Sequence, residues 1–163
     1  MLPHMLKRAQ EKPTLQVLDV GCGPGSITLG LAKRIPQGTV TGLDMSEDVL
    51  GKARRLADEQ GASNVRFQRG DVFQLPFEDG TFDVVHTHQC IAHCRESVKA
   101  IKELVRVTRK GGIVCMREGD MRSVRFWPES PLLEESFDCL ARTAEQTKNA
   151  WSDAGRRLKA WTV

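Results

Sequence analysis

The chain has 163 residues, of which 40% are hydrophobic, and its 24 Lys and Arg against 21 Asp and Glu give a formal net charge of +3. This length and apolar content are sufficient for one domain with one core. The basic residues are scattered in short clusters, which argues against a nucleic-acid-binding surface. We therefore expect a single globular domain over residues 1–163 with no nucleic-acid partner.

The sequence contains no apolar run long enough to span a membrane. Its first twelve residues, MLPHMLKRAQEK, lack the apolar core of a signal peptide, and a mitochondrial presequence is the alternative interpretation of their basic residues and leucines. The five cysteines have neither the density nor the spacing of a secreted disulfide framework. These features favour a cytoplasmic protein with reduced thiols.

Strand patterns and helix patterns alternate along most of the chain. The predicted strands span residues 15–20, 39–43, 65–68, 82–86 and 113–116. Apolar residues at helical spacing predict helices that include residues 27–35, 46–61, 98–105, 133–144 and 156–161. The continuous apolar strands and their alternation with helices predict an α/β fold, with a doubly wound, mostly parallel sheet and right-handed crossovers.

The glycine-rich stretch VLDVGCGPGSIT, residues 17–28, connects the first predicted strand to the first predicted helix. Gly21 permits a tight turn, Gly23 lets the backbone approach a ligand, and Gly25 lets the helix pack close to the sheet. A dinucleotide fingerprint, G-x-G-x-x-G, would need glycine at position 26, where this chain has Ser26. The spacing argues against the alternative of an NAD(P)-dependent oxidoreductase.

Acidic residues follow the next two predicted strands. Asp44 stands nineteen positions after Gly25, where a carboxylate can accept hydrogen bonds from both ribose hydroxyls of a nucleoside. The alternative is a surface acid near a helix N-terminus. Asp71, in GDVFQLPFEDGTFDVV, can accept from an exocyclic amine while the next backbone N–H contacts a ring nitrogen. Taken alone, Asp71 also fits an ordinary turn residue.

Together, VLDVGCGPGSIT, VTGLDMS and GDVFQLPFEDGTFDVV resemble the class I S-adenosyl-L-methionine-dependent methyltransferases over residues 15–118. The LPF-x-D-x-x-FD segment resembles the branch that contains ubiquinone and menaquinone C-methyltransferases. The resemblance implies a Rossmann-like sheet, S-adenosylmethionine as cofactor, and methyl transfer to carbon or oxygen of a small molecule. It further implies roles in cofactor binding for Asp19, Gly21, Gly23 and Gly25 at the methionine moiety, Asp44 at the ribose, Met45 on the adenine, and Asp71 with Val72 at the adenine edge.

The catalytic residue is not identified by the sequence. His86, His88 and His93, in HTHQCIAHC, follow or end the fourth predicted strand, where a neutral histidine could remove a proton from an acidic carbon or hydroxyl. The alternative is that these histidines cap helices or hydrogen-bond to backbone. Their spacing matches no closed zinc pattern, so we expect no metal. Cys90 and Cys94 leave arsenite methylation open, although enzymes of that kind place their cysteines differently.

The segment MREGDMRSVRFWPESPLL, from Met116, resembles a segment of small-molecule methyltransferases from microbial and fungal secondary metabolism. The resemblance implies that Glu118 and Asp120 face the cleft. Phe126, Trp127 and Pro128 would then wall a substrate pocket, with ordinary core packing as the alternative. We expect residues 15–118 to form the cofactor-binding core and residues 119–163 to form a helical segment on the substrate side.

No strand pattern follows Met116, whereas the family sheet has seven strands. We therefore expect a truncated sheet that lacks the last two strands and exposes the edge of the fifth. An unpaired edge recruits other chains, so self-association through that edge is expected. The missing strands also favour an alternative function, a catalytically weak or inactive scaffold that binds cofactor or a partner.

Overall fold

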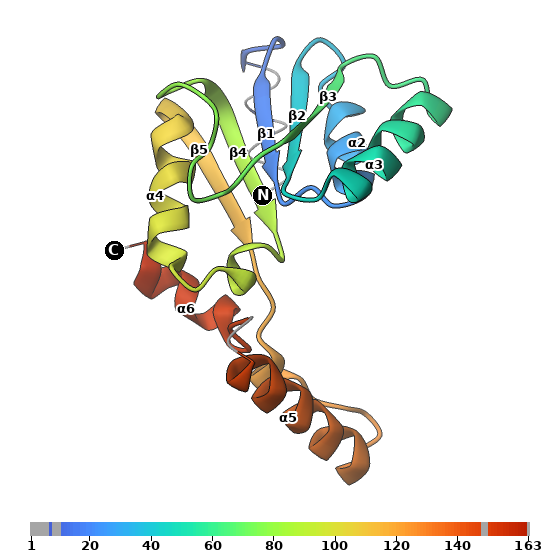
Figure 1. Ribbon diagram of the computed structural model, residues 1–163, viewed down its shortest axis with the longest axis vertical. Coiled ribbons are helices and arrows are strands. Elements are labelled where there is room, and N and C mark those ends of the chain that lie inside the picture. The colour runs from blue at the N-terminus through green and yellow to red at the C-terminus, as the bar shows by residue number, and fades with distance from the viewer. Residues whose placement is uncertain (1–6, 8–10, 148–149, 163) are drawn as a thin grey trace.

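The computed structural model describes residues 7, 11–147 and 150–162, and it has an α/β architecture (Figure 1). Five parallel strands form one sheet in the order β3-β2-β1-β4-β5. Their bounds are β1 Gln16–Val20, β2 Thr39–Asp44, β3 Val65–Arg69, β4 Phe82–His88 and β5 Thr108–Arg117. The predicted strands and their parallel pairing are confirmed. Residues 1–6 and 8–10, which carry most of the targeting interpretation, lie outside the described residues.

Helices connect β1 to β2, β2 to β3 and β4 to β5, and further helices follow β5, whereas a segment without a helix joins β3 to β4. Their bounds are α2 Ser26–Ala32, α3 Glu47–Glu59, α4 Ser97–Val107, α5 Pro131–Gln146 and α6 Ala154–Trp161, with short 3₁₀ helices η1 Ile91–His93 and η2 Met121–Ser123. Ser46 is the N-cap of α3, because its side chain accepts a hydrogen bond from the backbone N–H of Val49 at 3.4 Å.

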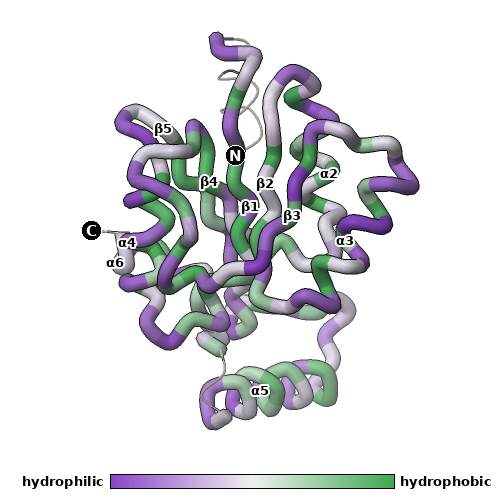
Figure 2. The backbone as a smooth tube through the Cα atoms, turned by 45° about the horizontal axis from the view of Figure 1, so that its top comes forward, coloured by the Kyte–Doolittle hydropathy of each residue, from purple (hydrophilic) through white to green (hydrophobic). Residues whose placement is uncertain are grey.

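The core lies on both faces of the sheet. On one face, Leu18 and Val85 pack with Leu104 of α4, and on the other Val17 and Val84 pack with residues of α2. This alternation along β1 and β4 explains why both strands have continuous apolar sequences. Figure 2 shows the hydrophobic stretches concentrated in these central strands. The two-sided cover confirms the doubly wound arrangement.

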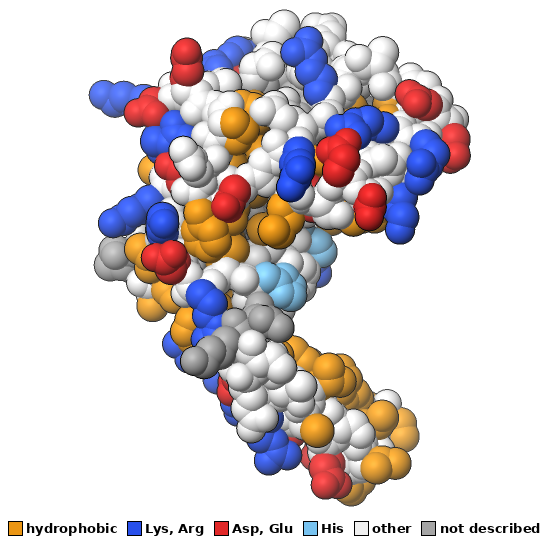
Figure 3. Space-filling model, viewed as in Figure 1, with side chains coloured by type: hydrophobic (Ala, Val, Ile, Leu, Met, Phe, Trp, Pro, Cys, Tyr) orange, Lys and Arg blue, Asp and Glu red, His pale blue; other side chains and the backbone are white. Residues whose placement is uncertain are grey.

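Strand β5 is an edge of the sheet, and no further strand pairs with its outer side among the described residues. The expected absence of the last two strands therefore holds for the described part of the chain, whereas self-association through this edge stays a prediction. Beyond β5, helix α5 projects from the body (Figure 1), and hydrophobic side chains gather on its surface (Figure 3). Leu132 and Leu140 are among its exposed residues. No helix among the described residues is long and apolar enough to cross a membrane.

The packing of α4 on the sheet leads to a stability prediction. Leu104→Ala, at a fully buried position, should lower the free energy of unfolding by about 2–5 kcal/mol, because it removes transfer energy and leaves a cavity. Val105 lies on the same helix and is 56% exposed. Val105→Ala should therefore change the free energy of unfolding by no more than about 0.5 kcal/mol. Urea unfolding measures both variants. Equal losses would show that α4 does not pack through the Leu104 face.

Candidate functional site

The turn between β1 and α2 has a backbone that requires glycine. The backbone φ values of Gly21, Gly23 and Gly25 are 70°, 54° and 86°. Residues other than glycine rarely adopt such positive φ values. A Cβ on Gly21 would lie 2.7 Å from Cys90 Sγ, and one on Gly25 would lie 3.0 Å from the Cβ of Ala53 in α3. Gly21 thus permits the tight turn as predicted, and Gly25 allows close approach to α3 and to Phe67 of β3. The roles of both glycines in cofactor binding stay predictions.

Asp19 lies beneath this turn rather than in an open cleft. The residue is 2% exposed, and its Oδ2 accepts a hydrogen bond from Thr28 Oγ1 at 2.6 Å. Its Oδ1 lies 2.7 Å from Nδ1 of His86, its neighbour in the parallel ladder. Because an ionised carboxylate only accepts, His86 carries its hydrogen on Nδ1 and donates it. The carboxylate therefore joins β1, α2 and β4.

Asp44 lies at the end of β2, beside the same turn. Its Oδ2 accepts a hydrogen bond from the Gly23 backbone N–H at 3.0 Å, and its Oδ1 accepts one from the Ser46 N–H at 3.0 Å. Each carboxylate oxygen can accept more than one hydrogen bond. The two backbone donors thus fix the orientation of Asp44 and leave it able to bind further donors.

A cavity of about 330 Å³ opens at the carboxyl ends of the strands, within the size range of small-molecule sites. Its lining includes these residues predicted from the sequence: Gly21, Asp44, Met45, Asp71, Val72 and His93. Asp71 itself is oriented by a hydrogen bond from the Phe73 backbone N–H to its Oδ1 at 2.9 Å. Met45 is 76% exposed at the cavity rim, so its side chain has open space on one side. The structure thus brings together the residues that follow β1, β2 and β3.

Other predicted site residues lie outside the lining. Gly23 adjoins the cavity through its hydrogen bond to Asp44, and Gly25 lies behind the turn. Asp19 and His86 are both 2% exposed and engaged with each other. His86 therefore leaves the set of candidate bases, because its ring is buried away from any substrate.

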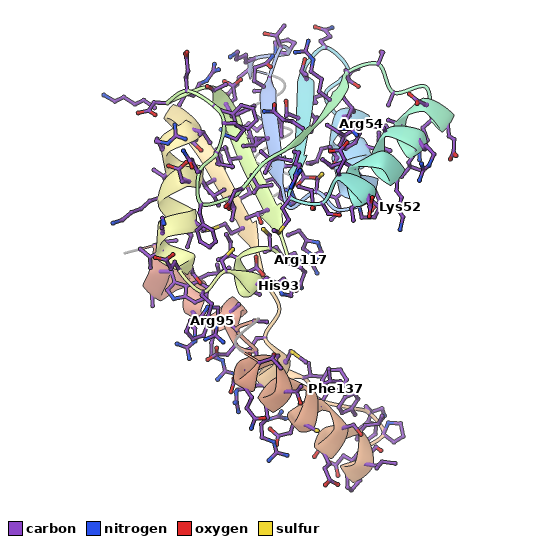
Figure 4. The ribbon with its side chains drawn as sticks, in the orientation of Figure 1. Lys52, Arg54, His93, Arg95, Arg117 and Phe137 are labelled. Carbon is purple, nitrogen blue, oxygen red and sulfur yellow. The ribbon has the colours of Figure 1, made fainter. Side chains whose placement is uncertain are left out.

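The two remaining histidines differ in position. His88 Nε2 lies 3.2 Å from Arg117 Nη1, and His88 is not among the residues that line the cavity. His93 is exposed on η1 and does line it, as its position below the sheet in Figure 4 illustrates. Among the described residues, no three His, Cys, Asp or Glu side chains gather to hold a metal ion.

The expectation that Glu118 and Asp120 face the cleft is wrong. The Glu118 carboxylate accepts hydrogen bonds from three successive backbone N–H groups, those of residues 90, 91 and 92, at 3.1, 2.9 and 3.2 Å. Asp120 pairs with Arg156 at 2.7 Å. Glu118 therefore holds the segment that begins η1, and the cleft-facing interpretation fails because neither Glu118 nor Asp120 is among the residues that line the cavity.

The aromatic residues after η2 do not wall the cavity. Phe126 packs against Phe137 of α5, with ring centroids 5.0 Å apart, and Trp127 is 92% exposed. Phe126 and Phe137 instead line a separate hollow of about 190 Å³ between α5 and the segment around η2 (Figure 4 labels Phe137).

The cavity residues Phe73 and Gln89 were not predicted from the sequence, and Cys90 and Cys94, which also line the cavity, were considered only for arsenite methylation. Gln89 has φ 56°, a left-handed conformation that is uncommon for a residue other than glycine and is often found at functional sites. The position of these residues after strand ends could have predicted that they line the cavity, because ligands of such sheets bind there.

A sequence profile of the methyltransferase domain matches residues 11–159, well over half of the chain. The chain belongs to the class I S-adenosylmethionine-dependent methyltransferases. S-adenosylmethionine is the cofactor of this family. The predicted family and fold class are confirmed.

Relatives of this methyltransferase chain are longer than the chain itself. An uncharacterized methyltransferase of Schizosaccharomyces pombe is 38% identical over 168 residues, which cover 98% of this chain and 58% of that protein. The demethylmenaquinone methyltransferase of Lactococcus lactis is 33% identical over 135 residues, covering 82% of this chain and 51% of that protein. The chain therefore spans about half of the length of these curated relatives.

The YcgJ protein of Bacillus subtilis has a similar solved structure. It superposes with a TM-score of 0.72 at 29% sequence identity, covering 99% of this methyltransferase chain and 64% of YcgJ. The match extends beyond the five-stranded sheet, because the sheet and its connections end at Arg117.

The contacts of Glu118 generate a prediction for the loop that borders the cavity. Glu118→Ala should speed amide hydrogen exchange at residues 90–92 and lower the free energy of unfolding by about 2 kcal/mol, because three buried donors lose a charged acceptor. Glu129→Ala, at an exposed position after η2, is the control and should leave that exchange unchanged. Unaltered exchange in the Glu118 variant would contradict the anchoring role.

Proposed function

We propose that the cavity at the ends of β1, β2, β3 and β4 binds S-adenosylmethionine and that the chain transfers its methyl group to a small molecule. The residues present fit such a cofactor. A Cβ built on Gly23 meets no atom within 4 Å, so the missing side chain leaves open space beside Asp44. The observation that carries the proposal is this pairing of a glycine turn with a fixed carboxylate at the mouth of one cavity.

Asp44 is proposed to bind the ribose. Its carboxylate is held by the backbone N–H groups of Gly23 and Ser46, so little conformational entropy is lost when it accepts the ribose hydroxyls. Hydrogen bonds to an ionised acceptor are the stronger kind. The alternative, a surface acid near the N-terminus of α3, would not require hydrogen bonds from both the Gly23 and the Ser46 N–H groups.

Met45, Asp71 and Val72 are proposed to hold the adenine. Met45 and Val72 offer apolar surface on the cavity wall, and the carboxylate of Asp71 can accept from the exocyclic amine. The Phe73 N–H keeps Asp71 in one orientation. Adenine recognition would thus depend on the segment that follows β3.

The glycine turn is proposed to hold the methionine moiety. Gly21 lines the cavity and Gly23 adjoins it, whereas Gly25 and Asp19 support the turn from behind. The contribution of Asp19 to cofactor binding is therefore indirect, through the position of the turn. This arrangement refines the role that the family resemblance implies for Asp19.

When bound, the cofactor supplies an electrophilic methyl group on a sulfonium, so the protein's task is to position an acceptor and exclude water. His93 is the histidine of HTHQCIAHC that lines the cavity, and we propose it as the base for a carbon or hydroxyl acceptor. The resemblance to demethylmenaquinone methyltransferase favours a quinol or related phenolic acceptor.

We further propose that two segments of one domain bind the cofactor and the substrate, respectively. Residues 15–118 contain the cavity and form the cofactor-binding core, and residues 119–163 form a helical segment on the substrate side. The five free cysteines support a cytoplasmic, reducing setting.

The proposed ribose contact is tested by Asp44→Ala. Loss of a charge-assisted acceptor, worth roughly 1.5–3 kcal/mol, should weaken binding of S-adenosylhomocysteine by about tenfold or more in a calorimetric titration. Asp48→Ala, an exposed acid in the first turn of α3, is the matched control and should bind normally. Equal affinities for the two variants would remove Asp44 from the site, provided both remain folded.

The role of His93 is tested by its effect on turnover. His93→Gln should lower the rate of S-adenosylhomocysteine formation with quinol and phenol acceptors by about 100-fold, in the range for general bases, and leave cofactor affinity unchanged. His88→Gln is the control, because His88 contacts Arg117 instead of the cavity. Wild-type turnover in the His93 variant would show that His93 is not a general base and that catalysis depends on positioning of the acceptor. Cofactor binding without turnover in the unmodified chain would favour the scaffold alternative.

A further inference from the structure

Two cysteines flank the short helix η1 on the wall of the cavity. Cys90 precedes Ile91–His93 and is half-buried, while Cys94 follows it and is 5% exposed. The Cys94 thiol donates a hydrogen bond to the Cys90 carbonyl oxygen, with 3.5 Å between sulfur and oxygen. Both cysteines line the cavity, so they lie side by side at the space that a ligand would enter.

The surroundings of Cys90 favour its thiolate. The neighbouring Cys94 thiol holds the pKa of Cys90 below its ordinary value in spite of burial. By contrast, burial raises the pKa of Cys22 to about 12. Cys90 is thus the activated thiol of a pair.

We propose that Cys90 and Cys94 form a redox-active dithiol, which a hydroperoxide entering the cavity converts to a disulfide. The Cys90 thiolate attacks the terminal O–H oxygen of the hydroperoxide and the O–O bond breaks, so Cys90 becomes a sulfenic acid and the other oxygen leaves as alkoxide, or as hydroxide when the oxidant is hydrogen peroxide. The Cys94 sulfur then attacks the Cys90 sulfur, the S–O bond breaks, and the oxygen leaves as water with the Cys94 hydrogen. The two cysteines lose two electrons, and the peroxide is reduced.

Closing this disulfide alters the wall of the cavity. The Cys90 sulfur packs so closely on the turn after β1 that a Cβ on Gly21 would lie 2.7 Å from it. Glu118 holds the backbone of residues 90–92, so the sulfurs must adjust through their side chains. The oxidised pair should therefore bind cofactor more weakly, an expectation that rests on the proposed cofactor site.

The test uses the full chain with Cys139→Ser, which removes the exposed cysteine and its intermolecular disulfides. Hydrogen peroxide is added, peptide mass spectrometry identifies the linkage, and calorimetry measures the affinity for S-adenosylhomocysteine before and after. We expect a Cys90–Cys94 disulfide, a loss of affinity of about tenfold or more, and recovery with dithiothreitol. The further substitution Cys94→Ser should abolish the disulfide of Cys90, whereas Cys115→Ser, outside the cavity, should leave the Cys90–Cys94 disulfide able to form.

Two results would overturn the proposal: no linkage between Cys90 and Cys94 under peroxide, or a complete linkage with unchanged affinity. Failure of the reduced chain to bind S-adenosylhomocysteine would instead contradict the proposed cofactor site. The linkage is measured without any ligand, so the two failures are distinguishable.

Discussion

The buried carboxylate of Asp19 is the constraint on which the site depends. A charge that is 2% exposed is costly unless its hydrogen bonds are made, and Asp19 makes them with Thr28 at 2.6 Å and His86 at 2.7 Å. These partners come from α2 and β4, so the bonds form only when β1, the following turn and β4 are in register. The same contacts fix the turn that faces the cavity.

With the turn in place, the strand order decides what surrounds it. Strands β2 and β3 lie on one side of β1 and β4 and β5 on the other, so the chain reverses its direction across the sheet at β1. Ligands of such sheets bind outside the carboxyl ends of the strands at this reversal. Asp44 and Asp71 reach the cavity from one side, and Cys90 and His93 reach it from the other. One cavity thus combines a side suited to a nucleoside with a side suited to an acceptor.

The sequence was sufficient to predict the elements and the placement of Asp44 and Asp71 near one another at the strand ends, because both depend on local patterns. Binding of a nucleoside there stays a proposal. Apolar runs define the strands, and the glycine turn and Asp44 occupy fixed positions relative to them. The other side depends on contacts between distant residues. His86 belongs to a conspicuous histidine cluster, yet its burial follows from its ladder partner Asp19, 67 positions away. Glu118 follows a strand, yet it caps backbone groups 26 to 28 residues earlier in the chain. Such pairings require the folded sheet.

The most direct test of the cofactor site is a crystal structure of the chain with S-adenosylhomocysteine. We expect the ribose hydroxyls to contact the Asp44 carboxylate and the adenine to lie among Met45, Asp71 and Val72. The homocysteine moiety should follow the glycine turn. Electron density for the ligand in the separate hollow beside Phe126 and Phe137, with the cavity beside Asp44 empty, would contradict it.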